Sequence, residues 1–203
     1  MLQSSFTPDK REAGCDEAGR GCLAGPVFAA AVVLEKDYAH PLLRDSKKLT
    51  AKQRDQLFDD IQNEALDFSI QKVSSKEIDE INILNASFLA MHRALDELKT
   101  APELILVDGN RFKPFKKINF ECIIKGDDKF LSIAAASILA KVSRDRYMQD
   151  MALKYPGYGW ESNMGYPTKA HRAGILSLGP TDIHRMSFRL LPKNEQLVLF
   201  DQK

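Results

Sequence analysis

The sequence predicts an α/β protein built on a mixed five-stranded sheet flanked by helices. Three strand-like segments come early in the chain, two helical segments follow the second and third of them, and two more strands precede the remaining helices. Three strands ahead of the helical crossover indicate a sheet that starts antiparallel and continues parallel. The length of 203 residues suits one domain with a buried core and a small appendage.

Apolar runs predict the strands. The first ends at Asp16 and Glu17, and the second, residues 27–34, is entirely apolar. Residues 67–73 alternate in polarity, which is typical of a half-buried strand. The runs at 103–107 and 118–124 complete the set, and the former has the composition of a central strand.

Capping patterns and apolar periodicity predict the helices. Thr50 with Gln53, and Ser74 with Glu77, each have the spacing of a capping box. The second box opens the longest amphipathic helix, and a later helix is rich in alanine and serine, which lets it lie close on the sheet. The four predicted helices cover residues 50–65, 74–98, 130–151 and 168–178, the last forming a small C-terminal helical extension. Residues 155–167 are rich in glycine, proline and aromatic residues and predict an irregular loop.

Composition excludes several classes of protein. Hydrophobic residues make up 44% and charged residues 28%, so the chain is not disordered, and the net charge of +1 leaves a localised nucleic-acid site possible. No targeting segment or membrane-length apolar stretch is present, from which we expect a cytoplasmic protein. The three cysteines lack CxxC spacing and the four histidines lack HxxxH pairing, which disfavours disulfides and zinc.

Two adjacent carboxylates, Asp16 and Glu17, run into a Gly19-Arg20-Gly21 turn beside buried strands. Buried acids call for a metal ion, a basic partner or acid/base chemistry. The flanking glycines allow the backbone to approach a ligand closely. The alternative is an ordinary strand-ending turn, which has a similar composition.

Further carboxylates follow later strands: Asp108 after the fourth, and Asp127 or Asp128 after the fifth. Strands that neighbour each other and end at the same edge would bring these acids together. An all-oxygen ligand set favours Mg²⁺ or Mn²⁺, and two such ions about 3.5–4 Å apart would suit a phosphodiester substrate. Both Asp16 and Glu17 can be ligands only if the first strand ends or bulges there.

These motifs, taken together, resemble bacterial ribonuclease HII, the type 2 ribonuclease H family. The matching stretches run in order from residue 14 to about 188, namely Asp16-Glu-Ala-Gly-Arg-Gly21, Asp45-Ser-Lys47, Val107-Asp-Gly109, Lys125-Gly-Asp127, residues 132–142 with Arg144-Asp145, Gly165-Tyr166, and His184-Arg185 with Ser187-Phe188. The resemblance implies a ribonuclease H-like fold. It also implies hydrolysis of the RNA strand of RNA–DNA hybrids and nicking 5′ of ribonucleotides embedded in duplex DNA. Two metal ions, Mg²⁺ or Mn²⁺, would serve the reaction, which leaves 3′-hydroxyl and 5′-phosphate ends.

The resemblance also assigns site residues. The metal-binding and catalytic acids would be Asp16, Glu17, Asp108 and Asp127. Asp127 is preferred to Asp128 because it directly follows the glycine and precedes Lys129 by two residues, whereas Asp145 is a competing candidate better explained by a structural ion pair. The substrate-binding residues would be Gly19, Arg20 and Gly21 at the ribose 2′-hydroxyl, Tyr166 against the sugar, and Ser46 and Lys47 at phosphates. For Tyr166 the alternative is an aromatic side chain that fills the core.

The domain would span residues 1–189, with a tail over 190–203. Within that tail Gln196, Leu197, Val198, Leu199 and Phe200 resemble the short peptide that docks into the sliding clamp of DNA polymerase, although the same side chains could pack on the domain. The basic residues Lys113, Lys116 and Lys117 would either extend the duplex-binding surface or form a solvated loop.

Two other functions fit the same features. A DNA nuclease of the same fold would use the same acids, but the Gly19–Gly21 turn argues for a substrate with a 2′-hydroxyl. A non-catalytic, clamp-tethered protein that binds hybrids would keep the acids as structural groups.

Overall fold

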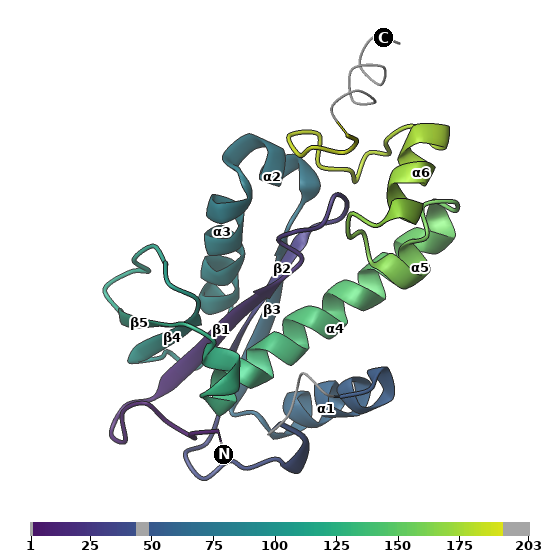
Figure 1. Ribbon diagram of the computed structural model, residues 1–203. Helices are drawn as coiled ribbons and strands as arrows, with labels where there is room; N and C mark the ends of the chain where they lie inside the picture. Colours follow the sequence, from purple (N-terminus) through teal and green to yellow (C-terminus); the bar gives the residue numbers. More distant parts are fainter. Residues whose placement is uncertain (1, 44–48, 193–203) are drawn as a thin grey trace.

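The computed structural model describes residues 2–43 and 49–192, and Figure 1 shows one five-stranded sheet at its centre. The strand order is β3-β2-β1-β4-β5. Strands β1, β2 and β3 pair antiparallel, and β4 and β5 continue the sheet parallel to β1. The strands are β1 Glu12–Ala18, β2 Val27–Val33, β3 Asp67–Val73, β4 Leu104–Asp108 and β5 Asn119–Ile123. The predicted mixed sheet is confirmed.

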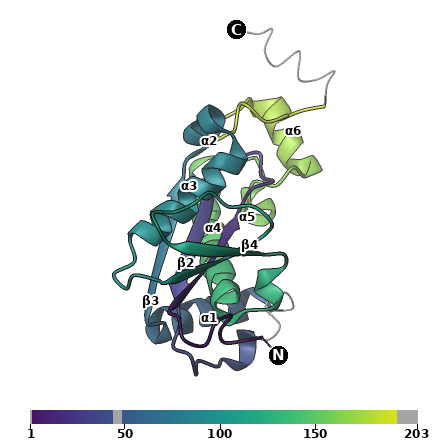
Figure 2. The same ribbon diagram turned by 90° about the vertical axis from the view of Figure 1, so that its left-hand side faces the viewer.

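Helices cover both faces of the sheet (Figures 1 and 2). Helices α2 and α3 lie on one face, α1 and α4 lie on the other, and α5 and α6 extend beyond the far end of α4. Their bounds are α1 Ala51–Glu64, α2 Ser75–Ile81, α3 Ile83–Asp96, α4 Leu131–Lys154, α5 Trp160–Asn163 and α6 Lys169–Leu178, with a 3₁₀ turn, η2, at Gly126–Asp128. None of the helices in the described part of the chain has the length and apolar character needed to cross a membrane.

Helix α4 lies in close contact with β1, as its small residues predict. A Cβ atom added to Gly14 would lie 2.2 Å from the backbone carbon of Ser132 and 2.4 Å from the backbone nitrogen of Ile133. On the helix side, Ala134, Ala135 and Ala136 are fully buried. The missing side chain at Gly14 therefore sets the distance between helix and sheet.

Both capping boxes are present, but the second helix is not continuous. Thr50 caps α1 and Ser74 caps α2 through reciprocal bonds with Gln53 and Glu77. The predicted helix over residues 74–98 is wrong in one respect, because it breaks at Asn82, which has a φ of 65°. The Asn82 side chain accepts a hydrogen bond from the backbone of Asn85 and caps α3. With a ψ of 162° this positive φ lies outside both helical regions, so α2 cannot run on into α3, and apolar periodicity gives no sign of it.

The segment predicted as an irregular loop, residues 155–167, contains the short helix α5. Trp160 opens that helix and is fully buried, with the Tyr158 ring stacked at a centroid distance of 4.8 Å. The aromatic residues that suggested a loop thus form a second small core beneath α6. Leu190 and Leu191 are buried in the same cluster. The boundary at residue 189 stays a prediction, because residues 193–203 lie outside the described residues.

We expect Gly14→Ala to lower the free energy of unfolding by about 2–3 kcal/mol, because the new methyl group meets backbone atoms that cannot turn aside. Urea denaturation followed by circular dichroism measures the effect. Gly21→Ala is the matched control, since a Cβ atom there meets nothing within 4 Å. Equal stability of the two variants would contradict the close contact between α4 and β1.

Candidate active site

The predicted acids lie at one end of the sheet, where β1 and β4 run side by side. The parallel pairing of these strands ends at Cys15 and Val107, so Asp16 and Asp108 follow at the point where the strands part. On its other side β1 stays paired with β2 as far as Ala18. Asp16 and Glu17 therefore lie inside β1, not after it as predicted, and their side chains start on opposite faces. The strand end that ligation by both acids requires is present only on the β4 side, where the pairing stops at Cys15.

The local contacts show where each carboxylate points. Asp16 is buried, and the nearby Ser137 side chain of α4 acts to lower its pKa. Glu17 is on the α3 side, and its Oε1 accepts from Nη1 of Arg20 at 3.0 Å. Asp108 Oδ1 accepts from the Gly126 backbone N–H at 2.7 Å. This last bond ties β4 to the 3₁₀ turn that carries Asp127.

The carboxylates influence one another electrostatically. Burial raises the pKa of Asp16 well above its ordinary value, and the negative charges of Glu17 and Asp108 raise it further. Burial also raises the pKa of Glu17, the Arg20 guanidinium opposes that shift, and Asp108 adds to it. Three carboxylates at one end of the sheet repel one another when they are ionised, which is energetically unfavourable. A nearby cation would stabilise their charged forms.

The donor chemistry of these residues fits a hard divalent cation. Asp16, Glu17 and Asp108 offer carboxylate oxygens from two neighbouring strands. The adjacent Cys15 is fully buried, and burial raises the pKa of its thiol, which disfavours sulfur as a ligand. Within residues 2–43 and 49–192, however, no three acidic, histidine or cysteine side chains are already gathered as a metal cluster. Asp127 is half-buried on η2 while Asp128 is exposed, which agrees with the preference for Asp127. The assignment of the four acids as ligands stays a prediction.

A cavity of about 280 Å³ opens beside these acids on the α3 side. Glu17 and Asp108 form part of its wall, and Arg20 and Arg111 bring positive charge to it. Ser87, Phe88 and Met91 of α3 also line it. Ser87 and Ser137, on helices packed against the acids, were not singled out in the sequence, and only their helical register relative to the acids could have indicated them.

The Gly19–Gly21 turn is held from beneath by a buried arginine. Arg185 is fully buried and donates from Nη2 to the Gly19 carbonyl at 2.7 Å and from Nη1 to the Arg20 carbonyl at 2.9 Å. Its Nε donates to the Gly25 carbonyl at 2.9 Å. Burial lowers the pKa of Arg185 to about 10. This pKa is still well above neutral pH, so the guanidinium stays charged there.

A second buried arginine fills the space under Gly19. Gly19 has a φ of 98°, and a Cβ atom there would lie 2.0 Å from Arg144 Nε. Arg144 donates to the carbonyls of Met164, Ala24 and Pro26 at 2.8, 3.2 and 3.3 Å. A glycine is therefore required at position 19 both for its backbone conformation and for the space that Arg144 occupies.

Tyr166 lies next to this turn. The guanidinium carbon of Arg144 is 5.8 Å from the Tyr166 ring centroid. Burial, together with the neighbouring Cys22, raises the pKa of the Tyr166 hydroxyl. The Leu23 backbone N–H donates to the Gly165 carbonyl at 2.8 Å, which joins the two loops directly. The tyrosine is 41% exposed, so a core-filling role does not describe it. The structure thus brings the predicted 2′-hydroxyl turn and Tyr166 into one surface.

Two buried histidines anchor the Tyr166 loop. His171 Nδ1 donates to the Tyr166 carbonyl at 2.9 Å, and its Nε2 accepts from the Trp160 indole at 2.9 Å. His184 Nδ1 accepts from the Thr181 backbone N–H at 2.8 Å, which leaves the His184 Nε2 proton to point at His171 Nε2, 3.1 Å away. These partners assign both rings as neutral.

Several of the remaining predicted residues lie outside the described part of the chain. Ser46 and Lys47 lie outside the described residues, as do Gln196, Leu197, Val198, Leu199 and Phe200 of the tail. Asp145 pairs with Lys141 at 2.7 Å, which confirms the structural ion pair expected for it.

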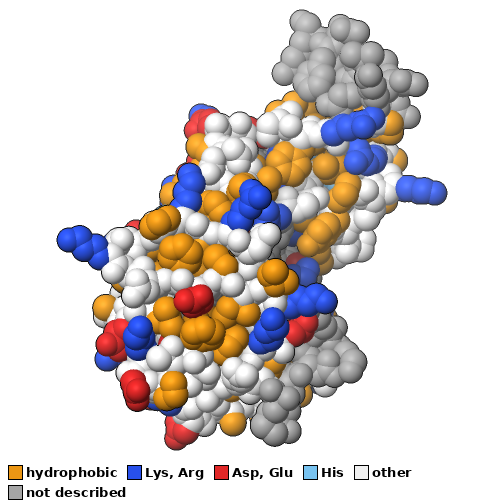
Figure 3. Space-filling model, turned by 60° about the vertical axis from the view of Figure 1, so that its left-hand side comes forward, with side chains coloured by type: hydrophobic (Ala, Val, Ile, Leu, Met, Phe, Trp, Pro, Cys, Tyr) orange, Lys and Arg blue, Asp and Glu red, His pale blue; other side chains and the backbone are white. Residues whose placement is uncertain are grey.

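The aromatic residues of the basic loop are packed on α3. Phe112 and Phe115 contact His92, and Phe115 is buried, so these rings are not free to stack on a ligand. Lys113 and Lys117 are exposed, whereas Lys116 pairs with Asp96 at 2.7 Å. On the face of the molecule shown in Figure 3, lysine and arginine side chains are spread between apolar patches.

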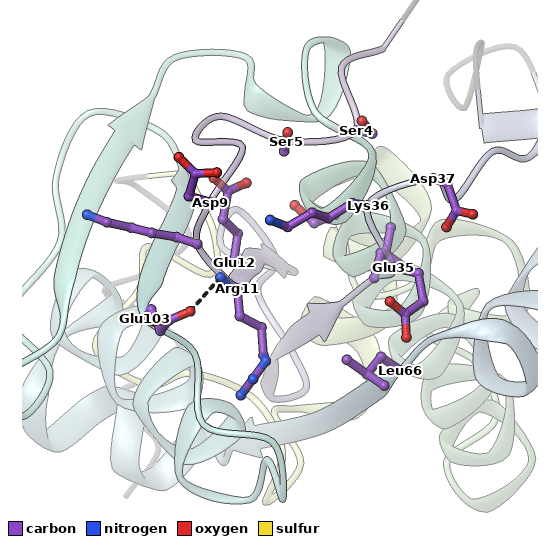
Figure 4. A pocket seen from close by; sticks show the side chains of 13 residues that line it. Ser4, Ser5, Asp9, Arg11, Glu12, Glu35, Lys36, Asp37, Leu66 and Glu103 are labelled. Atoms are coloured by element: carbon purple, nitrogen blue, oxygen red, sulfur yellow. Dashed lines mark hydrogen bonds between the residues drawn. The ribbon is translucent and has the colours of Figure 1, made fainter.

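A cavity of about 390 Å³ lies at the opposite end of the sheet, where β1 begins (Figure 4). Its wall mixes acidic and basic side chains, and the Arg11 backbone N–H donates to Glu103 at 2.9 Å across it. The Glu12 carboxylate accepts from the backbone N–H groups of Phe6 and Thr7. These contacts fasten the N-terminal segment to the sheet, far from the proposed catalytic acids.

The fold and the acidic sheet end define a nuclease of the ribonuclease H type. The model of the ribonuclease HII family matches residues 13–191. A ribonuclease HII of Bacteroides fragilis is 59% identical over 202 residues, covering all of both chains, and that of Phocaeicola vulgatus is 56% identical over 197 residues, covering 97% of this chain and 98% of its own. The chain belongs to the ribonuclease HII family and is a hydrolytic ribonuclease with ribonuclease H activity.

Solved structures agree with this assignment. The crystal structure of ribonuclease H2 from Pyrococcus horikoshii has a TM-score of 0.78 and 29% identity, and the match covers 94% of this chain and 99% of that one. The ribonuclease HII of Archaeoglobus fulgidus, solved in complex with PCNA, has a TM-score of 0.72 and 29% identity over 90% of this chain and 97% of that one. The predicted ribonuclease H-like fold is confirmed.

The neutral histidine pair predicts an acid-sensitive stability. Burial and the neighbouring His171 lower the pKa of His184 to about 4, from about 6.5 in an unfolded chain. Between these values the unfolded chain binds a proton that the folded chain excludes, so we expect about 3 kcal/mol of stability to be lost as pH falls from 6.5 to 4. Urea denaturation at several pH values measures this loss. His184→Gln should remove that share of the slope, and an unchanged slope would contradict the network.

Proposed function

We propose that the protein hydrolyses the RNA strand of RNA–DNA hybrids and nicks duplex DNA on the 5′ side of embedded ribonucleotides. One observation carries the proposal: the carboxylates at the end of β1 and β4 share a surface with the Gly19–Gly21 turn and Tyr166. A 2′-hydroxyl both donates and accepts hydrogen bonds, and it is the group that distinguishes a ribonucleotide. A general DNA nuclease would need no such contacts.

In this proposal Asp16, Glu17, Asp108 and Asp127 hold two divalent cations, Mg²⁺ or Mn²⁺. When bound, such ions offset the charge of the phosphate and acidify an attacking water. The Glu17 backbone N–H donates to Asp16 Oδ1 at 2.7 Å and the Gly126 N–H donates to Asp108 Oδ1, and these bonds orient the two carboxylates. The products would carry 3′-hydroxyl and 5′-phosphate ends.

The substrate is positioned by the residues around the acids. Arg20 and Arg111 flank the cavity beside Glu17 and provide charge for phosphates. The Tyr166 ring packs against the ribose, and backbone groups of the Gly19–Gly21 turn contact its 2′-hydroxyl. Ser46 and Lys47 remain proposed phosphate contacts. We place the enzyme in the cytoplasm, where bacterial DNA would supply such substrates.

We expect the enzyme with Mg²⁺ to nick a DNA duplex that carries one ribonucleotide, on its 5′ side, and to leave the matching all-DNA duplex intact. Denaturing gels with labelled strands measure both. Asp108→Asn should abolish the nick, more than a thousandfold, while the circular dichroism spectrum and melting temperature stay close to those of the wild type. Loss of one acid from a cation site removes charge that the transition state requires.

Asp128→Asn is the matched control for this experiment, because Asp128 is exposed beside the half-buried Asp127. It should retain cleavage, whereas Asp127→Asn should lose most of it. Cleavage of the all-DNA duplex by the wild type would favour a general nuclease. Turnover by Asp108→Asn at the wild-type rate would overturn the assignment of the acids.

We also propose that residues 196–200 bind the sliding clamp. Support comes from the archaeal relative that was solved in complex with PCNA, and from the glutamine and apolar residues of this segment. A synthetic peptide of residues 193–203 should bind the bacterial clamp in calorimetry, and Phe200→Ala should weaken binding at least tenfold by removing an apolar anchor. A scrambled peptide is the control, and equal binding by it would contradict the proposal.

A further inference from the structure

The side chain of Arg185 donates hydrogen bonds to the backbone of the Gly19–Gly21 turn and to the nearby Gly25. Its three contacts go to the carbonyl oxygens of Gly19, Arg20 and Gly25, at 2.7 to 2.9 Å. The residue is fully buried, and it lies about 165 positions further along the chain than the turn that it holds. Burying a guanidinium costs free energy unless its donors are well paired, so these contacts are strong constraints on the turn.

The hydrogen bonds from Arg185 also fix the direction of the N–H groups of the turn. The carbonyl and the N–H of a trans peptide point in opposite directions. Because the Gly19 and Arg20 carbonyls point inward to Arg185, the N–H groups of Arg20 and Gly21 in the same two peptides point outward. Arg20 and Gly21 are both exposed. Two backbone donors are thus presented side by side at the edge of the acidic site.

We propose that Arg185 is a positioning residue for ribonucleotide recognition, which holds two peptide planes of the Gly19–Gly21 turn so that the N–H groups of Arg20 and Gly21 face the substrate. The inference rests on the function proposed above and adds the group that makes the turn selective. Arg185 does not touch the substrate. It acts through the backbone of the turn, and Arg144 supports the same arrangement from beneath Gly19.

The fork shape of arginine explains why another cation cannot replace it. The guanidinium bonds two successive carbonyls of the turn and a third from Gly25 at once. The ammonium of a lysine is a single point and cannot keep the same three directions. Arg185→Lys therefore keeps the charge but loses at least one of these hydrogen bonds, so that part of the backbone is no longer held in place.

A matched control exists in the same region. Arg172, at the start of α6, also bonds backbone carbonyls, those of Arg189 and Leu190, but does not contact the turn. Arg172→Lys should disturb the packing of the final described residues without altering the turn. Comparing the two variants separates a specific effect on recognition from a general loss of structure.

The experiment measures binding by fluorescence anisotropy in Ca²⁺, on a duplex with one ribonucleotide and on the identical all-DNA duplex. Wild type and Arg172→Lys should prefer the ribonucleotide duplex. Arg185→Lys should lose at least tenfold of that preference, while its affinity for the all-DNA duplex stays within twofold. Single-turnover cleavage in Mg²⁺ should fall in parallel for Arg185→Lys alone.

Retention of the wild-type preference by folded Arg185→Lys overturns the inference, and so does an equal loss of affinity for both duplexes. If Arg185→Lys does not fold, citrulline placed at position 185 by peptide ligation keeps the side-chain shape but removes the charge and one donor direction. The same loss of preference is then expected, and its absence overturns the inference. A wild type without preference would instead overturn the proposed function, which distinguishes the two failures.

Discussion

The contact between α4 and β1 is the constraint on which the rest of the site depends. Gly14 has no side chain, so the helix backbone comes within contact distance of the strand. This places Ser137 on the helix against Asp16 on the strand two residues after Gly14. Further along the same helix, Arg144 reaches the space beneath Gly19. One close packing contact therefore aligns both the acidic residues and the turn beside them.

Different interactions position the acids and the neighbouring turn of the site. The acids are placed by strands whose parallel pairing ends at the same level, and their burial makes ionisation unfavourable without a compensating charge. The adjacent turn and the Tyr166 loop are shaped by buried cations that bond backbone carbonyls. Negative side chains thus gather at the end of the sheet, and buried positive side chains hold the backbone of the neighbouring turn and loop.

Much of this arrangement could be predicted from the sequence, because its signals are local. Apolar runs and capping boxes located the strands and most helix starts, and acids at strand ends indicated the site. The break at Asn82 could not be predicted, since one asparagine side chain overrides a continuous apolar period. The roles of Arg144 and Arg185 were also missed, because an arginine that bonds distant carbonyls has the same sequence appearance as one that binds phosphate.

The distance in sequence between Arg185 and the turn that it holds affects the order in which the site is completed during synthesis. A ribosome releases the strands and the acids of β1 and β4 well before residue 185 has been added. A growing chain can therefore assemble its sheet and carboxylates while the Gly19–Gly21 turn still lacks its support from Arg185. If Arg185 acts as proposed, the capacity to select a ribonucleotide is among the last properties that the nascent protein acquires, after the proposed metal-binding acids of β1 and β4.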